Sequence, residues 1–511
     1  MNIFPEYHKY DALGLIEIIK SGEITYKEVC QEAIQRAKLL NPSLNAIIHP
    51  LYEQLEGILK KVSESGSFYG VPFLLKDLQH ALQGVPLSSG SKAMYNFVPP
   101  KDNELVRRWK DTGLITLGKT NTPELGLMAT TEPELFGPAR NPWNLEHSPG
   151  GSSGGSAAAV SARIVPVASA GDGGGSIRIP ASCCGVFGLK PSRGRMPTGP
   201  DFGEIWEGAV TDHILSISVR DSAALLDATH GPDQGAPYLI SKPKKSFLQE
   251  ASQDPQTLKI GYSLDHPLKE EVHPECKHAV TQTASLLSEL GHRVEEVPLP
   301  YDGELVAECY TQMYFAQTAA ILELMGQLRG SVIKRKEVEL STWTLASQGK
   351  IKKAKDYCLS LIRWNDISRA MGRYHQKQDL LLTPVLATPP PLIGEMQLNG
   401  LERFGLNLIN TLHLERLLSI FGTVEEKVLT NLVKTPFTQV ANISGQPAMS
   451  VPLYWTDQGL PCGVQFIAPL GDEGTLFNLA GQLERTKPWF DKAPPYPEAN
   501  KQNPRATFCS Y

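Results

Sequence analysis

Short apolar runs alternate with helix-patterned segments along most of this 511-residue chain, which limits the folds open to it. In 258–263 (LKIGYS) and 292–299 (HRVEEVPL), strand-like runs enclose a helix-patterned segment, 276–291. A strand, a crossover helix and a second strand predict parallel strands in one sheet. Three further strand-like runs lie earlier in the chain: 70–78 (GVPFLLKDL), 114–120 (LITLGKT) and 164–170 (IVPVASA). The pattern predicts an α/β fold with a largely buried sheet.

The chain is long enough to bury a large core, and a single catalytic domain is expected at 66–495. Residues 1–65 are expected to be helices that cover this domain, and 496–511 to be an irregular tail. The amphipathic segment 401–433 is expected to pack on the sheet, with a substrate-capping or membrane-facing role as the alternative.

Composition and charge exclude several classes of protein. The formal net charge of -5 shows no basic bias, so no nucleic-acid partner is expected. No run approaches the ~18 apolar residues of a membrane span, and no signal peptide is evident, so a cytoplasmic protein is expected. The eight cysteines form no CxxC pair, which argues against a zinc site and a disulfide scaffold. Cys183 and Cys184, in an apolar stretch, are expected to be small buried side chains.

The run 171–176 (GDGGGS) has the composition of an anion-binding turn. It lacks the lysine of a phosphate-binding P-loop and the third glycine of a dinucleotide fingerprint. Three adjacent glycines can instead turn their backbone N–H groups inward, into a nest that stabilises an oxyanion. Ser176, at the end of this run and just after a strand, is then a candidate nucleophile. A purely structural turn is the alternative.

A second run, 148–160 (SPGGSSGGSAAAV), offers another serine. Gly150 to Gly154 satisfies GxSxG, which would make Ser152 the nucleophile of an α/β-hydrolase elbow with a histidine further along the chain. That elbow must follow a strand, whereas this run follows the loop 140–149 (RNPWNLEHSP). The elbow is therefore kept as the alternative mechanism.

Lys76 is a candidate general base because it follows Phe73, Leu74 and Leu75 in an apolar run. Burial disfavours the charged form of a lysine and lowers its pKa by up to ~3–5 units from ~10.4. The neutral amine can then accept a proton from a nucleophile. An ion pair with Asp77 or another acid is the alternative.

Five runs together resemble the amidase signature family, most densely between residues 70 and 200. They are GVPFLLKDL (70–78), GKTNTPELG (118–126), RNPW (140–143), PGGSSGGSAAAV (149–160) and GDGGGSIRIPASCCGVFGLKPSRGR (171–195). A weaker similarity follows at 435–453 and 461–469. The resemblance implies a mixed β-sheet sandwiched between helices, and hydrolysis of a C–N amide bond without metal or organic cofactor.

Carried over by position, the resemblance implies a catalytic triad of Lys76, Ser152 and Ser176. Lys76 would be the base, Ser152 the bridging serine after a cis peptide bond from Gly151, and Ser176 the acylated nucleophile. The resemblance also implies residues that bind the oxyanion and the substrate: the N–H groups of Gly173, Gly174, Gly175 and Ser176, with Ser153 beside them. It further implies that Asp172 pairs with Arg178 and so supports the loop. The family commonly has threonine or isoleucine at the position of Gly173. The glycine here still has its backbone N–H, so no oxyanion donor is lost.

The implied substrate is a small-molecule amide, and linear, cyclic, aryl and lipid amides all remain open. The run 309–315 (CYTQMYF) is expected to line the acyl pocket. One alternative function is that of the A subunit of a glutamyl-tRNA amidotransferase, which shares these motifs and passes ammonia to a partner enzyme. An inactive scaffold is another alternative, and a homodimer is a further expectation.

Overall fold

This computed structural model describes residues 3–63, 65–411 and 423–495. All eleven strands within these residues belong to one mixed sheet. The order across the sheet is β1-β3-β2-β4-β6-β5-β10-β11-β9-β7-β8. The strands are β1 Ile47–Pro50, β2 Pro72–Lys76, β3 Ile115–Thr120, β4 Val167–Asp172, β5 Phe187–Lys190, β6 Thr211–Ser216, β7 Lys259–Tyr262, β8 Arg293–Glu296, β9 Leu380–Pro384, β10 Ala448–Val451 and β11 Val464–Ile467. β2 runs parallel to β3 and β4, and β7 runs parallel to β8 and β9.

The helices are α1 Ala12–Ser21, α2 Tyr26–Leu44, α3 Leu55–Leu59, α4 Glu104–Asp111, α5 Gly154–Ser161, α6 Arg178–Cys184, α7 Val219–Thr229, α8 Phe247–Ala251, α9 Pro274–Glu289, α10 Gly303–Arg329, α11 Leu340–Ile351, α12 Ala354–Tyr374, α13 Gly400–Thr411, α15 Thr423–Lys434, α16 Gln439–Ile443 and α17 Glu473–Thr486. α9 connects the parallel strands β7 and β8, which confirms the predicted strand-helix-strand unit. The N-terminal segment contributes the edge strand β1 as well as helices. The predicted tail, 496–511, lies outside the described residues.

Side chains of the strands alternate between two hydrophobic clusters. Phe73 and Leu75 of β2 belong to one cluster and Leu74 to the other, and Ile214 and Leu215 of β6 are divided in the same way. Because successive side chains of a strand point to opposite faces, both faces of this sheet must be covered. α4, α7 and α17 contribute to the first cluster, and α2 and α5 to the second. The sheet is therefore sandwiched between helices, as expected.

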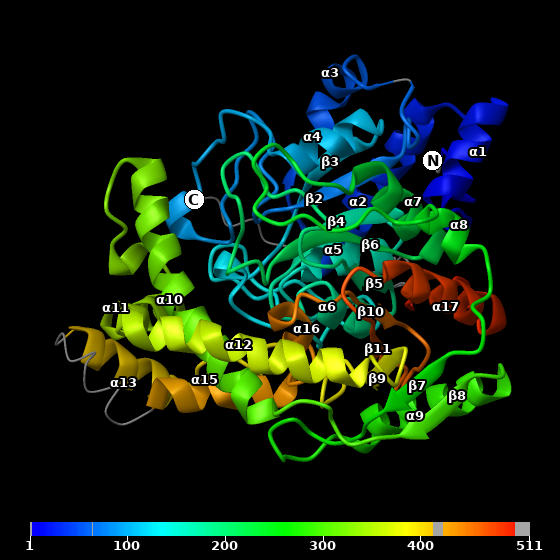
Figure 1. Cartoon of the computed structure of the whole chain (residues 1–511). Coiled ribbons are helices and arrows are strands. Elements are labelled where there is room, and N and C mark those ends of the chain that lie inside the picture. The colour runs from blue at the N-terminus through cyan, green and yellow to red at the C-terminus, as the bar shows by residue number, and fades with distance from the viewer. Residues whose placement is uncertain (1–2, 64, 412–422, 496–511) are drawn as a thin grey trace.

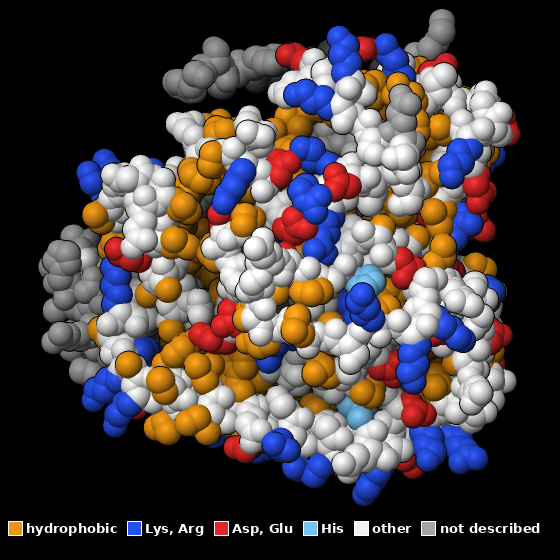
Figure 2. All heavy atoms as spheres, turned by 45° about the horizontal axis from the view of Figure 1, so that its top comes forward, with side chains coloured by type: hydrophobic (Ala, Val, Ile, Leu, Met, Phe, Trp, Pro, Cys, Tyr) orange, Lys and Arg blue, Asp and Glu red, His pale blue; other side chains and the backbone are white. Residues whose placement is uncertain are grey.

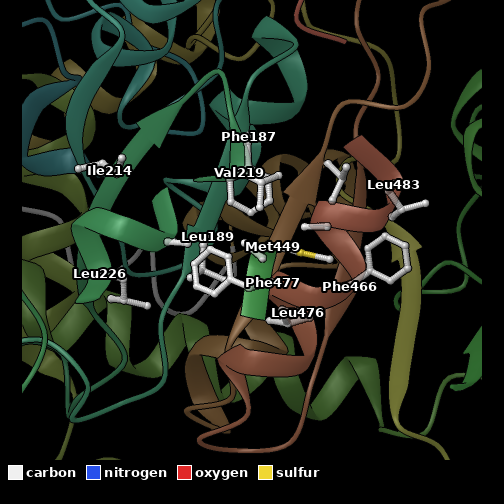
Figure 3. Packing of buried hydrophobic residues seen from close by; sticks show 14 of the residues in the cluster. Phe187, Leu189, Ile214, Val219, Leu226, Met449, Phe466, Leu476, Phe477 and Leu483 are labelled. Atoms are coloured by element: carbon white, nitrogen blue, oxygen red, sulfur yellow. The ribbon is translucent and has the colours of Figure 1, made fainter. Parts of the chain in front are cut away.

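The first face shows how this packing is built (Figure 3). Phe187 of β5 and Phe477 of α17 are fully buried, with ring centroids 6.3 Å apart. Leu226 of α7 lies in the same cluster. Full burial of one such side chain contributes roughly 1.5–3 kcal/mol. The same cluster contains Phe73 of β2 and Val167 of β4, the strands that lead to Lys76 and the glycine-rich run.

The long helices α10, α11, α12, α13 and α15 gather on one side of the molecule (Figure 1). Buried residues of α10 and α12, such as Phe315 and Trp364, share a third cluster with Ala448 of β10. Within the described residues, no helix combines the length and the apolar character needed to cross a bilayer. On the face shown in Figure 2, acidic and basic side chains are mixed.

Candidate active site

The neighbouring parallel strands β2 and β4 bring the predicted base and the glycine-rich loop together. Leu74 of β2 pairs with Ala168 of β4, so Lys76 at the end of β2 lies beside the end of β4. The glycine-rich loop starts where β4 ends, at Asp172. In open α/β sheets, ligands bind at the carboxyl ends of the strands. The register of two strands thus places Lys76 beside the loop of Ser176.

The Lys76 side chain is buried, and its amine faces Ser152. Nζ donates to Ser152 Oγ at 2.8 Å and to the carbonyl oxygen of Gly171 at 3.4 Å. Burial lowers the pKa of Lys76 to about 7, although the carboxylates of Asp212 and Asp172 act in the opposite direction. A large share of this amine is therefore neutral near pH 7, as a general base must be.

Asp77, the alternative partner of Lys76, is bound elsewhere. Its carboxylate accepts a hydrogen bond from the Ser88 hydroxyl and lies 3.9 Å from the Lys119 amine. Burial raises the pKa of Asp77 to about 6. Within the described residues, no ion pair joins Asp77 to Lys76.

Ser152 lies in a buried loop just before α5. The peptide bond between Gly151 and Ser152 is cis, as expected from the resemblance. Within the described residues, the side chain that hydrogen-bonds to the Ser152 hydroxyl is that of Lys76, and no histidine hydrogen-bonds to it. The GxSxG run does not directly follow a strand, so the context of a nucleophile elbow is missing.

The glycine-rich loop is held by a buried ion pair. Arg178 donates through Nε and Nη2 to the two carboxylate oxygens of Asp172, at 2.9 and 2.8 Å. Burial alone would raise the pKa of Asp172, but the Arg178 guanidinium holds that pKa below its ordinary value. Both side chains are fully buried, so losing one partner would leave an uncompensated charge in the core. The pair therefore supports the loop structurally, as expected.

Arg178 is itself held by the C-terminal part of the chain. It donates to the carbonyl oxygen of Thr438 at 2.8 Å and to side-chain oxygens of Asn442 and Gln465, both at 2.7 Å. The Thr438 hydroxyl also donates to the carbonyl oxygen of Gly174 at 2.5 Å. Sequence analysis did not single out these three residues, although they lie in the two weakly similar C-terminal runs.

The backbone donors of the loop are not equivalent. The N–H of Gly175 donates to Asp172 Oδ1 at 2.7 Å, so this expected oxyanion donor is already engaged. The N–H groups of Gly173, Gly174 and Ser176 make no hydrogen bond within the described residues. Of these three, Gly174 and Ser176 line the cavity described below. Two residues at the cavity wall thus carry N–H groups that no hydrogen bond within the described residues engages.

The two serine loops lie side by side, because the Ser153 N–H donates to the carbonyl oxygen of Ser176 at 3.3 Å. Ser153 is fully buried and its hydroxyl donates to the carbonyl oxygen of Gly171, so it supports the site without lining the cavity. In the described chain, no hydrogen bond joins the hydroxyls of Ser152 and Ser176. Catalytic hydrogen bonds of free enzymes often tighten only when substrate binds.

A cavity of about 380 Å³ opens from Ser176. Tyr310 and Tyr314 of α10 line it, as predicted for 309–315. α13 and α15 line it too, through Leu406, Ile409, Val428 and Leu432. Leu432 belongs to the third cluster with Ala448 of β10, and the other three pack against that cluster, so these residues both pack beside the sheet and line the cavity. Residues 412–422 of the amphipathic segment 401–433 lie outside the described residues.

Cys183 and Cys184 are fully buried, as predicted. Burial raises the pKa of both thiols above the ordinary value, which disfavours the reactive thiolate. In the described part of the chain, no group of three or more His, Cys, Asp or Glu side chains is arranged to hold a metal ion.

A polar group behind Lys76 was missed by sequence analysis. The Lys76 backbone N–H donates to Ser169 Oγ at 2.7 Å, and that hydroxyl lies 2.8 Å from His80 Nδ1. His80 Nε2 is 3.4 Å from Asp212 Oδ1. A Cβ at Gly171 would lie only 2.2 Å from the same carboxylate oxygen, so position 171 needs glycine here. The contacts that link Lys76, Ser169, His80 and Asp212 join residues more than 80 positions apart, and no local pattern marks them.

We expect kcat/KM for amide hydrolysis to rise with pH through a midpoint near 7 and then to level off. Only the neutral Lys76 amine can accept a proton, and burial lowers its pKa to about 7. The neutral fraction increases with pH, so the rate increases in the same direction. Initial rates measured between about pH 5 and 9 check this expectation.

Two variants test whether this midpoint belongs to Lys76. Burial also lowers the pKa of Lys190 to about 7, but its amine donates to the carbonyl oxygen of Pro191 at 2.8 Å. Lys190→Met should therefore keep the midpoint. Asp212→Asn should move it to lower pH, because the Asp212 carboxylate favours the charged amine. An unchanged midpoint in Asp212→Asn would contradict the assignment.

Comparison with known proteins gives consistent matches over nearly the whole chain. A family model described as amidase matches residues 28–477. The chain is 35% identical over 508 residues to a 6-aminohexanoate-cyclic-dimer hydrolase of Paenarthrobacter ureafaciens, covering 97% of this chain and 98% of the relative. A solved structure of 6-aminohexanoate cyclic dimer hydrolase matches with a TM-score of 0.86 at 34% identity, covering 95% and 99%. A bacterial aryl acylamidase of the amidase signature family matches with a TM-score of 0.80 at 27% identity, covering 94% and 96%.

Proposed function

This chain belongs to the amidase signature family and is a hydrolase of amide bonds, and we propose that Lys76, Ser152 and Ser176 carry out its reaction. The observation that carries the proposal is the 2.8 Å hydrogen bond between the buried amine of Lys76 and the hydroxyl of Ser152. A buried lysine with a pKa near 7 is matched to proton transfer at neutral pH.

The proposed reaction has two stages. Neutral Lys76 accepts the Ser152 proton as Ser152 accepts the Ser176 proton, and Ser176 Oγ attacks the amide carbon. The oxyanion is bound by the N–H groups of Gly174 and Ser176, where one such donor is worth ~3 kcal/mol of the barrier. The relay returns the proton to the leaving amine, which gives an acyl-enzyme. Water, activated by the same relay, then releases the acid.

The cavity disfavours an anionic substrate. Most of its lining side chains are apolar, Glu402 contributes a carboxylate, and among the described lining residues none is Lys, Arg or His. A carboxylate carried by the acyl part of the substrate, such as the α-carboxylate of glutamine, would find no cation among the described lining residues. We therefore infer that the substrate is an aliphatic, cyclic or aryl amide that brings no carboxylate into the cavity, rather than glutamine, which disfavours the role of an amidotransferase subunit.

A panel of amides tests this proposal on the purified chain. It contains the cyclic dimer of 6-aminohexanoate, an N-acyl anilide, the linear 6-aminohexanoate dimer and glutamine, each assayed for released amine or ammonia. We expect kcat/KM on an uncharged amide to exceed that on glutamine by at least about 100-fold, since an unpaired buried charge is heavily penalised. Preference for glutamine would favour the amidotransferase role. No turnover of any amide, with no covalent labelling by a fluorophosphonate, would support an inactive scaffold.

A further inference from the structure

The hydroxyl of Tyr310 lies against the loop that carries the proposed oxyanion donors. Tyr310 projects from α10, is 8% exposed and lines the cavity together with Gly174 and Ser176. A Cβ built at Gly174 would lie 2.1 Å from the Tyr310 hydroxyl oxygen and 2.7 Å from the ring carbon that bears it. Glycine is therefore needed at 174, and the hydroxyl is within contact distance of this residue.

The ring of Tyr310 is held firmly by its neighbours. It stacks on Tyr314 with centroids 5.9 Å apart and an interplanar angle of 20°. The ring of Trp206 lies at 71° to the same ring, with the centroids 6.4 Å apart. A group fixed in this way is preorganised, so it needs no reorientation when charge develops on a substrate.

The two stacked tyrosines differ in their hydrogen bonds. The Tyr314 hydroxyl donates to the carbonyl oxygen of Leu127. The Tyr310 hydroxyl has no hydrogen-bond partner within the described residues. Unlike the Tyr301 hydroxyl, it is not an enclosed polar atom, and Tyr310 lines the cavity, so a substrate oxygen there can accept its hydrogen bond. Burial raises the pKa of Tyr310 above its ordinary value, so the hydroxyl stays protonated and can donate.

We propose that the Tyr310 hydroxyl is a catalytic donor that binds the scissile carbonyl oxygen beside the N–H of Gly174. Because the Gly175 N–H is engaged by Asp172, this hydroxyl supplies a further donor at the cavity wall. Its hydrogen bond strengthens as the neutral carbonyl becomes an oxyanion, so the effect falls mainly on the chemical step. This inference rests on the proposed function of Ser176 as nucleophile.

Tyr310→Phe tests the proposal because it removes the hydroxyl and keeps the stacked ring. We expect kcat to fall about 100-fold with little change in KM. The affinity for a trifluoromethyl ketone that Ser176 attacks should fall by a similar factor, since its adduct carries the oxyanion. Tyr301→Phe is the matched control: Tyr301 is also buried with an unpartnered hydroxyl, but it does not line the cavity. Its kcat should be unchanged.

The outcomes separate this inference from the proposed function. If the wild type hydrolyses amides and Tyr310→Phe keeps its kcat, Tyr310 only packs, and the inference fails while the proposed function stands. A rise in KM with an unchanged kcat would assign the hydroxyl to ground-state binding and would also overturn it. An inactive wild type would overturn the proposed function and this inference together. The thermal unfolding midpoints of Tyr310→Phe and Tyr301→Phe should match that of the wild type. A difference in kcat then cannot be attributed to loss of folded protein.

Discussion

Ser176→Ala lowers kcat for amide hydrolysis by at least about four orders of magnitude, which is the expected effect of removing a catalytic nucleophile. The hydroxyl makes no hydrogen bond within the described residues, so its loss should leave the loop and the cavity intact. The Ser176 backbone would keep its contact with the Ser153 N–H. The measurement is kcat on the best amide of the panel, together with the thermal unfolding midpoint, which should change little.

Covalent labelling provides the second part of this test. A fluorophosphonate should add one mass increment to the wild type at Ser176 and none to Ser176→Ala. Cys184→Ala is the matched control, because it shortens a fully buried side chain near the loop and should keep both labelling and most of the activity. Labelling at Ser152 that survives in Ser176→Ala would reverse the assignment and support the nucleophile-elbow mechanism.

The sheet and the loops that carry Ser152 and Ser176 were predictable because local sequence determines them. The strand-helix-strand unit at 258–299 needs only short apolar runs around a helical repeat, and its strands are parallel as predicted. The glycine-rich turn directly after an apolar strand likewise placed Ser176 at the end of β4. Lys76 is the intermediate case. Its apolar neighbours predicted burial, but only the register of β2 and β4 shows that the amine reaches Ser152 rather than Asp77.

The remaining parts of the site depend on contacts between distant segments. Asn442 and Gln465 hold Arg178 across more than 260 positions, and their polar side chains follow no periodic pattern. The amphipathic pattern of 401–433 predicts that one face of this segment is buried, but it does not identify the surface that buries it. Here four of the described apolar side chains, those of Leu406, Ile409, Val428 and Leu432, line a cavity. Tyr310 and Tyr314 have the same residue type and lie one helical turn apart, and only the structure distinguishes the partnered hydroxyl from the free one.

Lys76→Ala is expected to lower kcat by about two to four orders of magnitude, the range attributed to loss of a general base. Ser152 would lose its side-chain partner, and no other described amine lies within hydrogen-bonding distance of its hydroxyl. Without the relay, Ser176 would have to attack as a neutral alcohol and the leaving amine would depart unprotonated. The measurement is kcat at pH 8, where the wild-type amine is mostly neutral.

Two further variants distinguish a base from a structural cation at this position. Arginine keeps the positive charge but does not deprotonate in proteins, so Lys76→Arg should be as inactive as Lys76→Ala if the amine acts as the base. Small primary amines should partly restore Lys76→Ala, because the shortened side chain leaves room for them beside Ser152. The restored rate should increase with the fraction of neutral amine. Substantial activity in Lys76→Arg would show that charge alone suffices, and proton transfer through Ser152 would then be excluded as the role of Lys76.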